Sequence, residues 1–144
     1  MEPIYATEIR EVGPEVADFL ETGLLVLFEV GAPPELAEMS ALHEVTHMRD
    51  EPPEVGDVLV IEGHEFAITA VGEKAWKNVK DLGHAVFVFN GEDEVEMPGQ
   101  IYLQQEGVGS LADIVRPGAR MEIRSGSGAG SQAATEREGG AGEP

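Results

Sequence analysis

Hydrophobic residues occur along the chain in short runs that glycine and proline interrupt, and most of these runs predict β-strands. β-Branched and aromatic residues alternate loosely with polar ones over residues 3–12, and residues 24–30 form a continuous apolar run of strand length. Alternation indicates a strand with one buried face, and a short apolar run suits a strand that is buried on both faces. The same criteria predict further strands at 57–62, 65–71, 84–89, 92–97, 101–105 and 121–124.

Tight turns and short helices connect these strands. Gly63-His64 follows the strand predicted at 57–62, and Asn90-Gly91, the strongest kind of two-residue turn signal, follows 84–89. We therefore expect two β-hairpins. Short helices are expected at 14–22, 34–39 and 74–82. This pattern predicts an all-β fold, a small barrel-like arrangement of short antiparallel strands with two or three short helices.

The last twenty residues differ in composition from the rest of the chain. Residues 125–144 contain six of the 18 glycines and none of Val, Ile, Leu, Phe, Tyr or Trp. Such a segment cannot bury enough apolar surface to offset the entropy lost on ordering. We therefore expect one folded domain over residues 1–124, followed by a flexible tail rich in Gly, Ser and Glu.

The chain is strongly acidic and has no cysteine. Its 28 Asp and Glu residues against 9 Lys and Arg give a formal net charge of −19, of which −2 falls on residues 125–144. Nucleic acids and anionic membranes attract basic surfaces, so this charge argues against both as partners. The absence of cysteine excludes thiol catalysis and iron–sulfur clusters. No apolar run is long enough to span a bilayer, and the N-terminus does not resemble a signal peptide, so we expect a cytoplasmic protein.

Three lysines, the only ones in the chain, fall within the helix predicted at 74–82. On a helix, the spacing of Lys74, Lys77 and Lys80 places them on one side. They form either an ordinary solvated face or a basic docking stripe.

The most informative polar pattern is His43-Glu44-Val45-Thr46-His47, and two interpretations are open. It matches H-E-x-x-H, in which the two imidazoles on a helix bind zinc and the glutamate polarises a water molecule. Pro52-Pro53 limits the length of such a helix. On a strand, by contrast, His43, Val45 and His47 share one face, because side chains alternate with period 2. That arrangement suits a nucleophilic histidine with a second histidine nearby.

Several stretches, which follow one another over residues 4–124, carry a resemblance to a known family. They are Ile4-Tyr5 with Gly13, Phe28 to Pro33 with Leu36, Leu42-His43, Thr69 to Gly72, Asn78 to His84, Phe89 to Glu92, and Glu96 to Gly99. Together they resemble the sorbitol (glucitol)-specific enzyme IIA component of the bacterial phosphoenolpyruvate-dependent sugar phosphotransferase system. The chain departs from the family pattern H-x-H-G-E-L, because Val45 replaces its second histidine and His47 follows two residues later.

The resemblance implies a phosphotransferase component that carries a phosphoryl group. His43 falls where the family has its phosphorylated histidine, so it would accept phosphate from the His-containing phosphocarrier protein. It would then pass the phosphate to a IIB domain, which works with the IIC subunit of a sugar permease. His64 or His84 would support the phosphohistidine as a hydrogen-bond donor, with His47 and Thr46 as further candidates. Neither a cofactor nor a metal ion is required, because phosphate passes from one histidine to another nucleophile.

Other functions stay open on the sequence alone. The chain could be a non-catalytic regulatory or binding module of the same fold, since the second histidine of the family pattern is missing. A small zinc hydrolase would use His43 and His47 as ligands, with Glu44 beside them. A homodimer formed by strand exchange is a further alternative for a protein with two hairpins.

Overall fold

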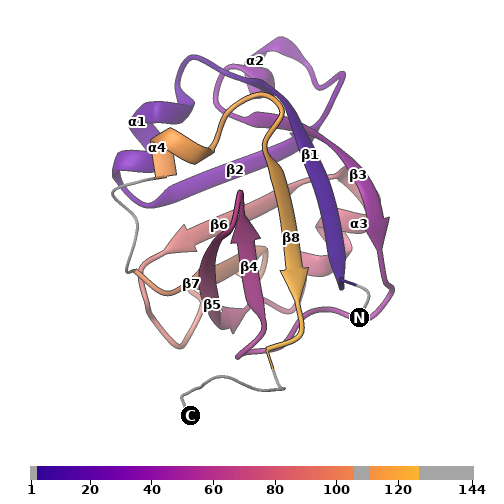
Figure 1. Ribbon diagram of the computed structural model, residues 1–144, viewed down its shortest axis with the longest axis vertical. Helices are drawn as coiled ribbons and strands as arrows, with labels where there is room; N and C mark the ends of the chain where they lie inside the picture. The colour runs from indigo at the N-terminus through magenta and orange to yellow at the C-terminus, as the bar shows by residue number, and fades with distance from the viewer. Residues whose placement is uncertain (1–2, 106–110, 127–144) are drawn as a thin grey trace.

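A computed structural model of the chain describes residues 3–105 and 111–126, in which eight strands close into a barrel with short helices around it (Figure 1). The strands are β1 (Tyr5–Val12), β2 (Leu24–Glu29), β3 (Ala41–Met48), β4 (Val58–Ile61), β5 (His64–Val71), β6 (Ala85–Phe89), β7 (Gln100–Leu103) and β8 (Arg120–Arg124). The helices are α1 (Val16–Glu21), α2 (Pro34–Ala37), α3 (Ala75–Leu82) and α4 (Leu111–Ile114). The all-β, barrel-like fold is therefore confirmed, with four short helices in the described residues rather than two or three.

The order of strands around the barrel is β1-β3-β2-β6-β7-β5-β4-β8, and β8 closes the ring against β1. Six of the eight neighbouring pairs are antiparallel, as predicted. The pairs β2·β3 and β6·β7 are parallel. Parallel neighbours cannot be joined by a tight turn, so each pair has a longer connection. The connection between β2 and β3 contains α2.

The hairpin predicted around Asn90-Gly91 is wrong, because residues 92–97 form no strand. The Asn90 side chain accepts a hydrogen bond from the Glu92 backbone N–H at 3.0 Å, which makes a local Asx turn. Gly91 donates its backbone N–H to the carbonyl of Leu103 at 2.8 Å, so the chain leaves β6 beside the end of β7. The four carboxylates within 92–96 also provide little apolar surface for a strand to bury.

The other hairpin, β4–β5, forms as predicted, with its turn one residue earlier. Glu62 and Gly63 have φ angles of 47° and 86°. Positive φ at both central positions is typical of the type I′ turn, whose twist suits a two-residue hairpin. His64 consequently belongs to β5 rather than to the turn.

Residues 41–48 form a strand, which decides between the two interpretations of the H-E-x-x-H segment. The zinc-peptidase hypothesis needs His43 and His47 on one helix, and β3 does not provide that helix. In the described part of the chain, no group of three or more His, Asp or Glu side chains could hold a metal ion.

The barrel interior is apolar and contains large side chains from most of the strands. Tyr5, Phe66 and Phe87 are among the largest fully buried residues. At one end of the barrel α1 packs against β2 and α4 (Figure 1). At the opposite side, Trp76 on α3 contacts the Tyr5 ring edge-on, with 5.6 Å between the ring centroids. This packing places the C-terminal end of α3 near the part of β3 that carries His43.

The predicted tail begins beside the barrel. The backbone N–H of Gly126 donates to the Asp57 carboxylate at 3.1 Å. Residues 127–144 of that prediction lie outside the described residues. None of the helices described is long and apolar enough to cross a membrane.

Candidate functional site

His43 points into the barrel and is completely buried, with 0% of its surface exposed. On β3 it alternates with Leu42 and Glu44, which lie on the outer face, and it pairs in register with Ile9 on β1 and Glu29 on β2. A neutral or charged imidazole in an apolar interior is costly unless its nitrogens are hydrogen-bonded. The groups that form hydrogen bonds with Nδ1 and Nε2 of His43 therefore define the site.

Two hydroxyl groups on β1 surround Nδ1 of His43. The Oγ1 atom of Thr7 lies 2.6 Å from Nδ1, and the Tyr5 hydroxyl lies 3.2 Å from it. Thr7 also donates a hydrogen bond to the backbone carbonyl of Glu44 at 2.9 Å. Tyr5 and Thr7 are themselves buried, because residues two apart on a strand face the same side.

The backbone carbonyl of Gly83 holds the other nitrogen, Nε2, at 2.7 Å. A carbonyl oxygen can only accept, so Nε2 carries the proton and donates it to Gly83. In the neutral imidazole, Nδ1 is then the acceptor: it accepts from the Tyr5 hydroxyl while the single Thr7 proton goes to the Glu44 carbonyl, or from Thr7 when that proton turns to Nδ1. The hydrogen bonds thus assign one tautomer to His43 in this closed arrangement.

Burial lowers the pKa of His43, because desolvation penalises the charged imidazolium. The hydrogen bond to Gly83 and the negative charge of Glu29 oppose this effect but do not reverse it. Burial also raises the pKa of Tyr5, so its phenol stays protonated and can donate. The site therefore favours a neutral imidazole, with neutral hydroxyls at Nδ1 and a carbonyl at Nε2.

The peptide of Gly83, at the end of α3, covers Nε2 of His43. Gly83 has φ 64°, the left-handed conformation that commonly ends a helix. The side chain of Glu29 lies against it so closely that a Cβ on Gly83 would overlap Cγ of Glu29. Glycine has no side chain that could shield His43. The position of this peptide over Nε2 therefore depends on the backbone conformation of Gly83 and on its contact with Glu29.

An open apolar hollow of about 320 Å³ lies on the surface beside this cover. It is lined mainly by Phe28, Val30, Leu36 and Leu82, together with Glu29. Val30 and Leu82 are 49% and 56% exposed, which is unusual for large hydrophobic side chains. We call this surface the Leu82 hollow.

His84 follows Gly83 in the chain but faces the outside of the barrel. Its ring stacks on Phe28, with 4.1 Å between centroids and 13° between planes. Its Nδ1 lies 3.2 Å from the carbonyl of Leu27, to which it donates. His84 is therefore connected to His43 through the Gly83 peptide, and its imidazole is on the other side of the sheet.

The structure does not bring His64 to His43. His64 begins β5, which is four strands away from β3 in either direction around the ring, and its side chain is exposed. His47 lies on the same strand as His43, near the end where Ala6 pairs with it, and is partly buried.

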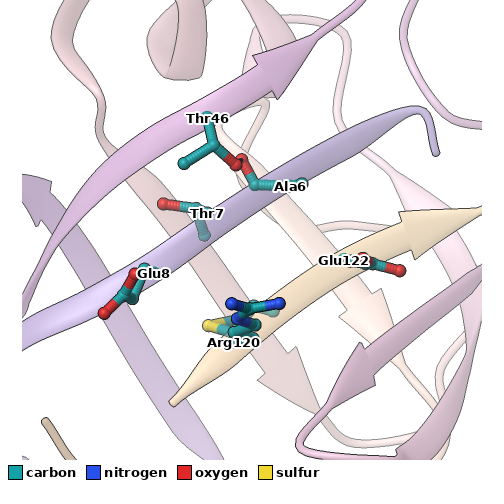
Figure 2. Close-up of a pocket in the computed structure, with 7 residues that line it drawn as sticks. Ala6, Thr7, Glu8, Thr46, Arg120 and Glu122 are labelled. Atoms are coloured by element: carbon teal, nitrogen blue, oxygen red, sulfur yellow. Dashed lines mark hydrogen bonds between the residues drawn. The ribbon is translucent and has the colours of Figure 1, made fainter. Parts of the chain in front are cut away.

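Thr46 faces outward, away from His43, in a hollow of about 270 Å³ between β3, β1 and β8. Its hydroxyl donates to the carbonyl of Ala6 at 3.1 Å, where the β1·β3 register shifts. Figure 2 shows Thr46 together with Glu8, Arg120 and Glu122 around this hollow. Thr46 therefore supports the β1·β3 pairing and does not contact the imidazole of His43.

Sequence reasoning missed four groups that define the site: Tyr5, Thr7, Glu29 and the Gly83 carbonyl. The alternation along 3–12 did indicate that Tyr5 and Thr7 share one face. Nothing in the sequence indicated that this face meets His43, because Tyr5 and Thr7 are 38 and 36 positions away from it in the chain. A backbone carbonyl leaves no signal in the sequence at all.

Comparison with known proteins links the chain to one family. Residues 4–116 match the family model described as the PTS system glucitol/sorbitol-specific IIA component. Two relatives described as glucitol/sorbitol-specific EIIA components, from Shigella flexneri and Escherichia coli K12, are each 30% identical to the chain over 125 residues. These matches cover 87% of this chain and 98% of each relative.

A solved structure supports the fold independently. The crystal structure of a PTS system IIA component from Enterococcus faecalis V583 matches with a TM-score of 0.65 at 18% identity. The match covers 81% of this chain and 96% of that one. The barrel is thus a known architecture, found also in that protein.

Proposed function

Because the chain belongs to the glucitol/sorbitol-specific IIA family of the sugar phosphotransferase system, we propose that it is a cytoplasmic phosphoryl carrier for polyol uptake. It would accept phosphate on His43 from the His-containing phosphocarrier protein and pass it to a IIB domain that works with a IIC permease. The observation that carries the proposal is the imidazole of His43, which is neutral and held in one orientation at both nitrogens.

We assign the attack to Nε2 of His43. Nδ1 lies among the buried hydroxyls of Tyr5 and Thr7, where a phosphoryl group has no space. The peptide of Gly83 covers Nε2, and glycine changes backbone conformation more easily than other residues. Phosphorylation therefore requires the Gly83 carbonyl to move away from the imidazole.

The attack also requires a lone pair on Nε2, so the proton must move from Nε2 to Nδ1. Thr7 accommodates this change, because its hydroxyl proton is donated to the Glu44 carbonyl and its oxygen can accept from Nδ1–H. As the new N–P bond forms at Nε2, the N–P bond of the donor phosphohistidine breaks, and its electron pair returns to the donor imidazole. No metal ion takes part in this step.

The Leu82 hollow is the surface on which we place the phosphocarrier protein. It lies directly beside Gly83, and its exposed side chains, Val30 and Leu82, could be buried by a partner. Docking there would also displace Glu29 from Gly83. Docking of the phosphocarrier protein would thus both position the phosphoryl donor and free the Gly83 peptide to move away from Nε2.

The test is phosphorylation of the full chain by phosphoenolpyruvate, enzyme I and the phosphocarrier protein. We expect one acid-labile phosphate on the wild-type chain and none on His43→Gln. His64→Gln is the matched control, because it removes an imidazole from the opposite strand, and it should label like the wild type. Label that persists in a folded His43→Gln variant would assign the acceptor to another residue.

Complete burial of His43 favours a second candidate, a non-catalytic regulatory or binding module. An imidazole with 0% exposure and partners at both nitrogens can also serve only to hold β1, β3 and α3 together. Absence of label on the wild-type chain, with enzyme I and the phosphocarrier protein active in the same tube, would support this role instead.

A further inference from the structure

A second hollow, of about 310 Å³, lies between the beginning of α3, the start of β6 and the segment that leads into β7. Its polar lining consists of Lys74, Asn78, His84 and Gln100, and Val86 and Met97 provide apolar surface. Among the residues that the structure describes, no Asp or Glu lines it, although the chain carries 28 of them. We call it the Lys74 hollow.

Lys74 differs from the other two lysines in its surroundings. Lys77 forms an ion pair with Asp81 on the next turn of α3, and Lys80 lies 4.0 Å from the carboxylate of Asp50. Within the described residues, the Lys74 side chain has no carboxylate partner. Its positive charge is therefore available to an anion that enters the hollow.

His84 is held so that its second nitrogen is left for a ligand. Stacking on Phe28 and the hydrogen bond from Nδ1 to Leu27 fix the ring. In the part of the chain that the structure describes, Nε2 of His84 has no hydrogen-bond partner. With Nδ1–H donated to Leu27, Nε2 can accept a hydrogen bond from the hydroxyl of a monoprotonated phosphate.

The side chain of Gln100 favours a ligand that also carries a hydroxyl group. Its Oε1 atom is buried and accepts no hydrogen bond from any described residue. A buried acceptor without a donor is costly, and a ligand hydroxyl would satisfy it. Gly99 leaves space beside the side chain of Asn78. A Cβ at this position would lie only 3.0 Å from the Asn78 side-chain nitrogen and would crowd it.

From these four side chains we infer that the Lys74 hollow binds a small phosphate monoester that also carries hydroxyl groups, such as a polyol phosphate. The phosphate would lie between Lys74 and His84, and hydroxyl groups would reach Gln100 and Asn78. The carbon chain would lie against Val86 and Met97. This binding function goes beyond the proposed carrier role and does not depend on it, since His43 lies on the other side of the sheet.

The experiment is a titration of the ¹⁵N-labelled full chain, followed by NMR, with three probes: sorbitol 6-phosphate, inorganic phosphate and sorbitol. We expect sorbitol 6-phosphate to shift the resonances of Lys74, His84 and Gln100 and to bind more tightly than either other probe. Lys74→Gln should weaken this binding by about tenfold or more, because a charge-assisted hydrogen bond is lost. Lys77→Gln, on the same helix, is the matched control and should leave the affinity unchanged.

A second variant separates the two parts of the inference. Gln100→Leu should weaken binding of sorbitol 6-phosphate and leave that of inorganic phosphate unchanged. Inorganic phosphate that binds as tightly as the ester would overturn hydroxyl recognition, and sorbitol that binds as tightly would overturn phosphate recognition. An equal loss in Lys74→Gln and Lys77→Gln, or no shifts at millimolar ester, would overturn the site itself. The spectrum of each free variant shows whether it is folded.

Discussion

At the scale of single residues, the site is a buried imidazole whose hydrogen bonds are supplied by groups of different kinds. Thr7 and Tyr5 offer hydroxyls, which can donate or accept, to Nδ1. Gly83 offers a carbonyl, which can only accept, to Nε2. This asymmetry fixes the tautomer of the closed state and leaves only the hydroxyl side able to adapt when the proton moves. In the proposed transfer, Thr7 is therefore the residue that we expect to influence both the stability and the reactivity of His43.

Replacing Thr7 with valine should test this dependence. Valine has nearly the same shape but no hydroxyl, so the buried Nδ1 and the Glu44 carbonyl both lose a partner. We expect the free energy of unfolding to fall by about 1–3 kcal/mol and phosphorylation of His43 to slow. Urea denaturation and the labelling assay measure the two effects. Thr7→Ser keeps the hydroxyl and should retain the labelling rate, and equal rates for valine and serine would exclude a role for Thr7 in the transfer.

The lowered pKa of His43 makes stability depend on pH. As the pH falls below the unfolded-state value of about 6.5, the unfolded chain binds a proton that the folded chain resists, so folding loses stability. We expect the wild-type free energy of unfolding to decrease between pH 7 and pH 5, and His43→Gln to lack that part of the decrease. Denaturant titrations at several pH values check this, with His64→Gln as control. A wild-type slope that persists in His43→Gln would assign it to other groups.

At the scale of elements, periodicity predicted most of the described strands and helices but not their neighbours. It wrongly predicted a strand at 92–97 and did not predict α4. Residues 3–12 and 24–30 were assigned correctly, because alternation and apolar runs are local properties of a strand. The parallel pairs β2·β3 and β6·β7 were missed, because periodicity states which face is buried and not which strand lies beside it. The same limit applies to the site. His43 was found from a motif, while its contacts to Thr7 and Gly83 depend on the order of strands and on the end of α3.

The end of α3 gives a prediction at this scale. Gly83→Ala should lower the free energy of unfolding by about 1–2 kcal/mol because of the left-handed backbone conformation alone. The overlap of the new Cβ with Glu29 should lower it further. Gly63→Ala is the matched control, because it has positive φ but nothing within 4 Å of a new Cβ. We expect urea denaturation to show a larger loss for Gly83→Ala than for Gly63→Ala, and Glu29→Ala to remove the difference. Equal losses would mean that Glu29 does not hold the cover in place.

At the scale of the whole molecule, the closed barrel and the negative net charge limit how the protein can bind other proteins. Each of the eight strands has a neighbour on both sides, so edge pairing between two copies has no free strand to use. A homodimer stays a prediction from sequence and would need another surface. The formal net charge of −19 makes the protein strongly acidic, and the Leu82 hollow is an apolar area on its surface. A partner that docks there therefore approaches through a negative field.

That field predicts how phosphoryl transfer depends on salt. In the proposed transfer, attraction between this acidic chain and a basic surface on the phosphocarrier protein would raise the association rate, and salt would screen it. We expect the second-order rate of His43 labelling to fall by about tenfold or more between low salt and roughly 0.5 M salt. Phosphorylation of the phosphocarrier protein by enzyme I, measured at the same salt concentrations, corrects for effects on the donor.

Two exposed glutamates show where on the surface this attraction acts. Glu35 lies on α2 near the Leu82 hollow, and Glu65 lies on β5 on the opposite side of the barrel. Glu35→Gln should lower the labelling rate at low salt more than Glu65→Gln, because its charge is closer to the docking surface. At high salt the two variants should behave alike. A rate that does not change with salt, or an equal effect of both substitutions, would show that the acidity of the surface does not guide the partner to His43.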